Sequence, residues 1–328
     1  MRDHYGREIN YMRISVTDRC NLHCSFCMPK EKDKICFQKK ENLLSYEEIM
    51  KAVDAVIPLG IHKFRITGGE PLVRDGIIDF IGDLKHHHGV EQVYLTTNGT
   101  LLGKHLDQLA KAGLDGINIS LCSTMESEYA NITGSHAMHT VMDRIYEAVG
   151  SGIHTKVNRV ILPEADEKDL IQAALIARDH PIEVRFIEMM PIGCGSSFGL
   201  TSGIEVLATL TKVFGAPVEG IKVKGNGPAV YHRFPGFKGN IGFINAMSCS
   251  FCDRCNRIRL TADGWLKLCL NYDDGIDLRR EIRSQIPEEE LSAMIRNAIL
   301  QKPRRHNFRD QEKEKHQKNT RIMAQIGG

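Results

Sequence analysis

The chain has 328 residues, of which 43 are Lys or Arg and 41 are Asp or Glu, leaving a formal charge of +2. This near balance argues against a general nucleic-acid binder. The 42% hydrophobic and 26% charged fractions are typical of a globular protein and exclude a disordered or membrane-embedded chain, and no stretch approaches the roughly 18 uninterrupted apolar residues of a membrane span. We therefore expect a cytoplasmic protein that contacts neither nucleic acid nor membrane.

Short runs of β-forming residues alternate with helical patterns between residues 10 and 190. Such alternation is typical of repeated βα units with a parallel sheet, so we predict an α/β fold. The best supported helix begins at Ser45, whose spacing from Glu48 predicts a capping box. The six predicted strands lie near 12–16, 63–67, 90–96, 116–121, 155–161 and 183–188, and the predicted helices near 45–59, 76–88, 101–112, 136–150 and 166–179.

The pattern changes after residue 190 to a Gly- and Ser-rich stretch, one helix, short strands and two final helices. From Lys302 to Arg321 the sequence is polar, carries charges of both signs and has few apolar residues, which is typical of a mobile segment. We therefore predict three parts: residues 1–190 as a first domain, 191–308 as a C-terminal α+β region, and 309–328 as a flexible tail that ends in Gly327 and Gly328.

Ten cysteines in a cytoplasmic chain of this length indicate metal ligation or catalysis and not a disulfide framework. Six of them form two tight triads. Three thiolates on a cluster of four irons leave one iron open to another molecule, whereas a structural zinc ion is closed by four ligands. The proposed cluster ligands are Cys20, Cys24 and Cys27 in the first triad and Cys252, Cys255 and Cys269 in the second. The alternatives are a zinc knuckle completed by His23 or by a distant cysteine, or one zinc site made of Cys24, Cys27, Cys252 and Cys255.

The first triad has the spacing CxxxCxxC and follows the first predicted strand. This motif resembles the radical S-adenosylmethionine superfamily, in which the open iron is chelated by the amino and carboxylate groups of S-adenosylmethionine. The sequence TGGEP at residues 67–71 directly follows the next predicted strand and resembles the segment that holds the amino group of that cofactor. Its glycine pair lets the backbone approach a ligand, and Glu70 can accept hydrogen bonds from an ammonium group.

Five motifs in order make the resemblance more specific: CNLHCSFCMP, FRITGGEPL, TTNG, RFIEMMP and FCDRCNRIRLTADGWLKLCL. Together they resemble the GTP 3′,8-cyclase family, also called the molybdenum cofactor biosynthesis protein A family. The resemblance implies an incomplete TIM-like barrel of six βα units and a C-terminal region that carries a second 4Fe-4S cluster facing GTP. It further implies a lyase that forms (8S)-3′,8-cyclo-7,8-dihydroguanosine 5′-triphosphate in the first step of molybdenum cofactor biosynthesis.

The resemblance also implies a radical mechanism. An electron delivered to the first cluster would cleave S-adenosylmethionine to methionine and a 5′-deoxyadenosyl radical. This radical would take the hydrogen from the ribose 3′ carbon of GTP, and the resulting radical would attack carbon 8 of guanine. Because such a radical is indiscriminate, we expect a dry, enclosed pocket in which it forms beside its target.

The triphosphate of such a substrate needs side-chain cations, because the only Gly-Lys pair, Gly103-Lys104, is followed by His105 and forms no P-loop. Arginine forks suit phosphate oxygens, and Arg257 and Arg259 alternate on a predicted strand so that both project to one side.

The S-adenosylmethionine contacts implied by the family, with Glu70 as our own candidate, are Phe26, Gly69, Glu70, Ser120 and Met190. The implied GTP contacts, with Arg185 as a further candidate, are Arg13, Arg65, Thr96, Lys156, Arg185, Arg257, Ile258 and Arg259. The catalytic set is Cys20, Cys24, Cys27, Arg257 and Arg259.

The chain departs from the family at Cys122, where members usually carry Asp. We expect a buried thiol there and not a ligand, and we expect Cys36, Cys194 and Cys249 to be non-ligands.

Two other functions stay open: a radical S-adenosylmethionine enzyme of another substrate class with an auxiliary cluster, and a zinc-stabilised structural or binding module. The expected partners are GTP, an electron donor protein and the next enzyme of the pathway, and a homodimer stays open.

Overall fold

A single sheet organises the computed structural model, which describes residues 1–31, 35–163, 165–308 and 319–327. Within these residues it has twelve strands in the order β12-β11-β10-β1-β2-β3-β4-β5-β6-β9-β8-β7. Six parallel strands pair in chain order at its centre, and they confirm the six predicted strands to within two residues at each end. These are β1 (Tyr11–Ser15), β2 (Lys63–Thr67), β3 (Gln92–Thr97), β4 (Gly116–Ser120), β5 (His154–Ile161) and β6 (Glu183–Glu188).

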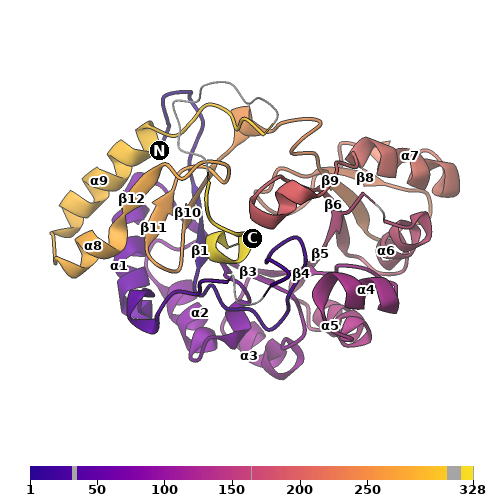
Figure 1. The fold of residues 1–328 in the computed structure, drawn as a ribbon, viewed down its shortest axis with the longest axis horizontal. Helices are drawn as coiled ribbons and strands as arrows, with labels where there is room; N and C mark the ends of the chain where they lie inside the picture. Colours follow the sequence, from indigo (N-terminus) through magenta and orange to yellow (C-terminus); the bar gives the residue numbers. More distant parts are fainter. Residues whose placement is uncertain (32–34, 164, 309–318, 328) are drawn as a thin grey trace.

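Helices cover the outer side of this curved sheet (Figure 1). The five predicted helices are confirmed, and short 3-10 turns complete the first and the third. The structure adds α4, which the pattern does not predict because its sequence ESEYANIT has few apolar residues. No helix in the described parts of the chain is long and apolar enough to cross a membrane. The helices are α1 (Tyr46–Val56), α2 (Ile77–His86), α3 (Leu106–Lys111), α4 (Glu126–Thr133), α5 (Met138–Gly150) and α6 (Glu167–Asp179).

The first helix begins as its sequence predicts. The Ser45 hydroxyl accepts a hydrogen bond from the Glu48 backbone N–H at 3.1 Å, and the Glu48 carboxylate accepts one from the Ser45 N–H at 2.8 Å. This reciprocal pair satisfies two backbone donors that a helix N-terminus otherwise leaves open. The helix therefore starts at a defined point and returns the chain to β2.

The alternation of side chains along the parallel strands separates an apolar face from a polar one. In β1, Met12 and Ile14 are fully buried in the core between the sheet and the helices, while Tyr11 and Arg13 project to the other side. The same alternation in β3 places Leu95 in the core and Thr96 on the polar side. Polar side chains from neighbouring strands consequently meet inside the curve of the sheet.

The C-terminal region extends the sheet at both edges. The strand β10 (Arg257–Leu260) pairs parallel with β1 and sets Arg259 beside Arg13, whereas β9 (Asn240–Ile244) pairs parallel with β6. Its arginine-bearing strand therefore lies directly against the first strand of the chain. The remaining strands and helices are β7 (Val218–Glu219), β8 (Val230–Arg233), β11 (Trp265–Lys267), β12 (Gly275–Asp277), α7 (Gly203–Phe214), α8 (Leu278–Arg283), α9 (Glu288–Leu300) and α10 (Met323–Ile326).

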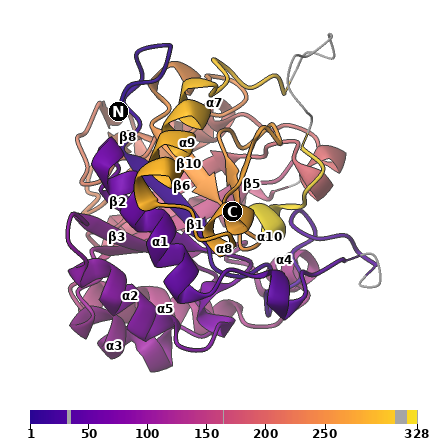
Figure 2. The ribbon, with the colours of Figure 1, turned by 90° about the vertical axis from the view of Figure 1, so that its left-hand side faces the viewer.

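The described end of the chain folds back to the centre of the molecule, beside β10 in both views (Figures 1 and 2). Arg321 donates to both carboxylate oxygens of Asp263, at 2.8 and 2.9 Å, and Lys267 donates to the Asn319 side chain at 3.0 Å. These bonds lead the short helix α10 inward. Of the segment that the sequence predicts to be a flexible tail, residues 309–318 and Gly328 lie outside the described residues.

Candidate active site

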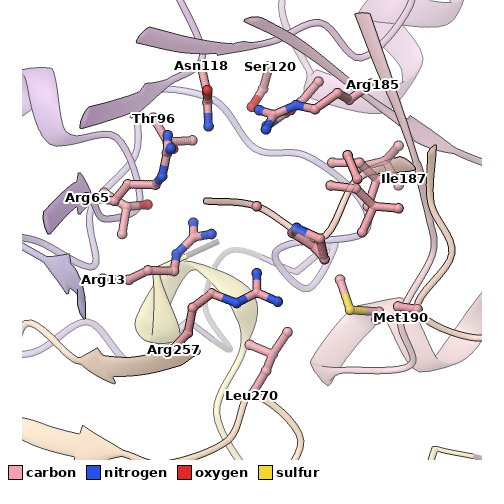
Figure 3. Close-up of a pocket in the computed structure, with 18 of the residues that line it drawn as sticks. Arg13, Arg65, Thr96, Asn118, Ser120, Arg185, Ile187, Met190, Arg257 and Leu270 are labelled. Carbon is pink, nitrogen blue, oxygen red and sulfur yellow. The ribbon is translucent and has the colours of Figure 1, made fainter. Parts of the chain in front are cut away.

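One cavity of about 670 Å³ lies on the polar side of the sheet, between the parallel strands and the C-terminal region (Figure 3). Its volume is in the range of pockets that hold small molecules and cofactors. All six cysteines of the two predicted triads line it, although the triads are more than 200 residues apart in sequence. The described residues contain no group of three or more Cys, His, Asp or Glu side chains that could hold a single metal ion.

The first triad lies in the loop after β1, and the end of α4 holds this loop in place. The backbone N–H groups of His23 and Ser25 donate to the carbonyls of Thr133 and Ile132, at 3.0 and 2.9 Å. The His23 ring lies 2.6 Å from the Pro29 carbonyl and does not line the cavity. Burial raises the pKa of Cys20 to about 11. Although burial favours the protonated thiol, Cys20, Cys24 and Cys27 all line the cavity, and they match in number the three cysteines that hold a cluster with one open iron.

The TGGEP segment packs against the same loop. The Gly69 and Glu70 N–H groups donate to the carbonyls of Thr17 and Arg19, at 2.7 and 2.8 Å, and a Cβ on Gly69 would collide with the Arg19 carbonyl. Only glycine allows this close approach.

The Glu70 carboxylate, in contrast, does not line the cavity. It accepts hydrogen bonds from the Leu72 N–H, the Thr97 hydroxyl and the Asn98 N–H, at 3.1, 2.8 and 2.7 Å. Burial raises its pKa to about 7. In this structure Glu70 holds the TTNG motif against the GGEP segment.

The remaining predicted S-adenosylmethionine contacts, Phe26, Gly69, Ser120 and Met190, all line the cavity. Cys122 also lines it, and its side chain is buried beside Cys24. This confirms the expectation of a buried thiol. The other three cysteines predicted as non-ligands, Cys36, Cys194 and Cys249, do not line the cavity.

The second triad lies in more cationic surroundings than the first. Although burial raises the pKa of the Cys252 thiol, hydrogen bonds from His306 and Ser250 outweigh it and bring the pKa to about 7. Burial acts in the same direction on Cys255, but the charges of Lys302 and Arg257 bring its pKa to about 6. Because the thiolate is the form that binds metal, these neighbours favour ligation at this triad.

Cations form much of the wall between the triads. Six of the eight predicted GTP contacts carry a charge, and all six line the cavity. Figure 3 shows several of them directed toward its centre. Like charges this close repel one another, and burial and the neighbouring Arg259 hold the pKa of Arg13 well below its usual range. Such a wall favours a polyanionic ligand. The six are Arg13, Arg65, Lys156, Arg185, Arg257 and Arg259.

Of the two uncharged GTP contacts, Thr96 lines the cavity and Ile258 does not. Ile258 is fully buried on the apolar face of β10, between the two arginines that face the cavity. Only the backbone of Ile258 is therefore placed to contact a ligand bound beside these arginines.

Tyrosines that the sequence does not single out hold two of these cations. The Arg65 Nε donates to the Tyr11 hydroxyl, and its guanidinium carbon lies 4.9 Å from the centre of the Tyr94 ring. The Lys156 ammonium donates to the Tyr231 hydroxyl at 3.3 Å. Tyr11 and Arg13 occupy alternate positions of β1, so the period-2 pattern is the signal that could have identified Tyr11. Four further lysines that the sequence does not single out, Lys63, Lys222, Lys224 and Lys302, also line the cavity.

The chain end closes part of this wall. The Gly327 carbonyl accepts a hydrogen bond from the Arg259 guanidinium at 3.2 Å. Gly327 has φ +83°, and a Cβ on it would lie 2.9 Å from side-chain atoms of both Ser15 and Thr67. The geometry at this point therefore requires glycine.

Comparison with known proteins covers the whole chain. Residues 14–176 match the Radical SAM superfamily, and residues 182–308 match the family Molybdenum Cofactor Synthesis C. The chain is 42% identical over 328 residues to a GTP 3′,8-cyclase of Clostridium perfringens (strain 13 / Type A), and 40% identical over 332 residues to one of Alkaliphilus oremlandii (strain OhILAs); each match covers 100% of both chains. The crystal structure of Streptococcus suis SuiB bound to S-adenosylmethionine has the same fold, with a TM-score of 0.61 and 13% identity over 80% of this chain and 60% of that one.

Proposed function

Because the chain belongs to the GTP 3′,8-cyclase family of radical S-adenosylmethionine enzymes, we propose that the cavity lined by the two triads is where it cyclises GTP. The enzyme is a GTP 3′,8-cyclase of molybdenum cofactor biosynthesis. The observation that carries the site assignment is that both cysteine triads and all six predicted cationic side chains line one cavity in the described chain. That arrangement suits a substrate with a triphosphate at one end.

The first half of the site serves the radical chemistry. Cys20, Cys24 and Cys27 would hold a 4Fe-4S cluster, which together with S-adenosylmethionine supplies the radical that removes a hydrogen atom from the substrate. Gly69 lines the cavity beside this triad and would contact the cofactor through its backbone. Phe26, Ser120 and Met190 would contact the rest of it.

The second half binds and orients the substrate. Cys252, Cys255 and Cys269 would hold a second 4Fe-4S cluster, and the three thiols fit one because they share the cavity and because Lys302 and Arg257 lie near Cys255. Its open iron would bind the guanine end of GTP. The six arginine and lysine side chains would neutralise the triphosphate, with Thr96 and the backbone near Ile258 as further contacts.

The division of the chain follows this assignment. We assign the first cluster and S-adenosylmethionine to residues 1–190, the second cluster and part of the GTP site to 191–308, and closure of the pocket to the end of the 309–328 segment. None of the ten cysteines forms a disulfide in this structure, which fits a protein of the reducing cytoplasm. The enzyme would there receive electrons from a donor protein and pass its product to the next enzyme of the pathway.

Iron content tests the two clusters. Anaerobic reconstitution is expected to give a brown protein with roughly eight irons per chain, and about four when Cys252, Cys255 and Cys269 are replaced by Ala. Cleavage of S-adenosylmethionine by the intact protein is expected to depend on added GTP. A colourless protein with one zinc, or cleavage that ignores GTP, would contradict the proposal.

Lys156 predicts a pH dependence of GTP binding. Burial and the nearby Arg185 lower its pKa to about 8, against an attraction from Glu183. The ammonium is charged below this pKa, and a bound triphosphate would raise the pKa further. GTP affinity should therefore fall as the pH rises through 8, and binding at pH 8.5 should take up protons, up to about one per GTP.

Calorimetry of GTP binding in two buffers with different ionisation enthalpies measures this uptake. The control is Lys156→Arg, whose guanidinium stays charged in this range. It should bind GTP without the uptake. Equal proton uptake by the variant and the original protein would assign the effect to another group.

A further inference from the structure

Arg7 connects three distant segments of the chain around the second triad. It lies before β1, and its side chain is only 3% exposed. Its Nε donates to the Asp3 carboxylate at 2.6 Å, and its Nη1 donates to the carbonyls of Cys252 and Arg304, at 3.1 and 2.9 Å. Its Nη2 donates to the carbonyls of Lys302 and Pro303, at 3.4 and 2.8 Å. All five N–H groups of the guanidinium therefore have acceptors.

The N-terminal turn fixes Arg7 before it reaches these partners. The Asp3 carboxylate is fully buried and also accepts the Arg7 backbone N–H at 2.9 Å, while the Asp3 N–H donates to the Arg7 carbonyl at 3.1 Å. Because the charge of Asp3 balances that of Arg7, the guanidinium can stay buried at this position.

The acceptors of Arg7 lead to the other ligands of the triad. Lys302 is 3% exposed, and its ammonium donates to the carbonyl of Leu268, the residue before Cys269. The His306 N–H lies 3.5 Å from the Cys252 sulfur. Residues 302–308 form no helix or strand, so these hydrogen bonds define the path of the segment.

We propose that Arg7 is a positioning residue for the second cluster: its guanidinium holds the Cys252 loop and the 302–306 segment, and through Lys302 the position of Cys269, at the spacing the cluster needs. The inference rests on the proposed function, in which this triad binds a 4Fe-4S cluster. It is distinct from a general role in folding, because the acceptors gather at one triad and not at the other.

Iron bound to one triad at a time tests the proposal. In a protein whose Cys20, Cys24 and Cys27 are replaced by Ala, all cluster iron reports on the second triad, about four per chain. Adding Arg7→Gln to this protein is expected to lower the iron at least fivefold and to remove the corresponding visible absorption and electron paramagnetic resonance signal. Arg7→Lys should not restore it, because an ammonium has three donors and not the planar fork of five.

Two controls separate positioning from misfolding. Arg7→Gln in a protein whose Cys252, Cys255 and Cys269 are replaced by Ala should keep about four irons at the first triad. Arg74→Gln removes another arginine that donates to backbone carbonyls, those of Val16 and Leu44, and should leave the iron of the second triad unchanged.

Each other result overturns the inference in a recognisable way. Full iron at the second triad after Arg7→Gln, equal iron loss at both triads, or full rescue by Arg7→Lys would each refute positioning by the guanidinium fork. No iron at the second triad while Arg7 is intact would instead refute the second cluster of the proposed function.

Discussion

Replacing Arg259 with Ala is expected to weaken GTP binding at least tenfold. Arg259 is buried in the cavity wall beside Arg13, where a charge-assisted hydrogen bond to a phosphate is worth about 1.5–3 kcal/mol. Because each 1.4 kcal/mol is a tenfold change in affinity, one lost bond is enough to reach this effect. Arg257→Ala is expected to act similarly, since its side chain projects to the same side of β10. The measurement is the GTP dissociation constant of the reconstituted enzyme by calorimetry, without S-adenosylmethionine.

The matched control is Arg296→Ala, which removes an exposed arginine from α9 and should leave the affinity unchanged. Iron content must be measured for every variant, because Arg257 is two residues from Cys255 and its loss could act through the cluster. Unchanged GTP affinity in both Arg257→Ala and Arg259→Ala would remove these side chains from the substrate site. If Arg296→Ala weakened GTP binding equally, the loss of affinity would be explained by the change in net charge alone.

Local patterns in the sequence were sufficient to predict where the parallel strands lie and toward which face of the sheet these arginines project. In CNRIR the period-2 rule assigns Arg257 and Arg259 to one face of a strand, and β10 has both facing the cavity with Ile258 in the core. The same rule applies to Tyr11 and Arg13 of β1. Where one strand has both a core face and a cavity face, residue type alone reveals its orientation.

Contacts between distant segments could not be predicted in this way. Arg7 donates to backbone carbonyls of residues 245 to 297 positions further along the chain. Every residue type has a carbonyl, so such an acceptor leaves no mark in the sequence. Glu70 illustrates a second limit: its chemistry suits an ammonium group, but its orientation toward Thr97 and Asn98 depends on how the loops after β2 and β3 pack.

The end of the chain gives the second large expected effect: Gly327→Ala should lower the rate of GTP cyclisation at least tenfold while leaving the iron content unchanged. A Cβ at this position would meet Ser15 and Thr67 at 2.9 Å, and the φ of +83° costs about 1–2 kcal/mol for a non-glycine residue. Both effects would displace the Gly327 carbonyl from Arg259. The measurement is product formation under anaerobic conditions with saturating S-adenosylmethionine and GTP.

Gly236→Ala is the matched control, because Gly236 has φ +76° but nothing within 4 Å of an added Cβ. It shares the backbone strain without the collision, so it should keep most of the activity. Full activity after deletion of Gly327 and Gly328 would leave the chain end without a role.

If the chain end acts by holding Arg259, Gly327→Ala should lower the cyclisation rate much less in an Arg259→Ala background than alone. The two residues then belong to one interaction, so their effects do not add. Additive losses would mean that the chain end acts on the substrate or on the closure of the pocket independently of this arginine.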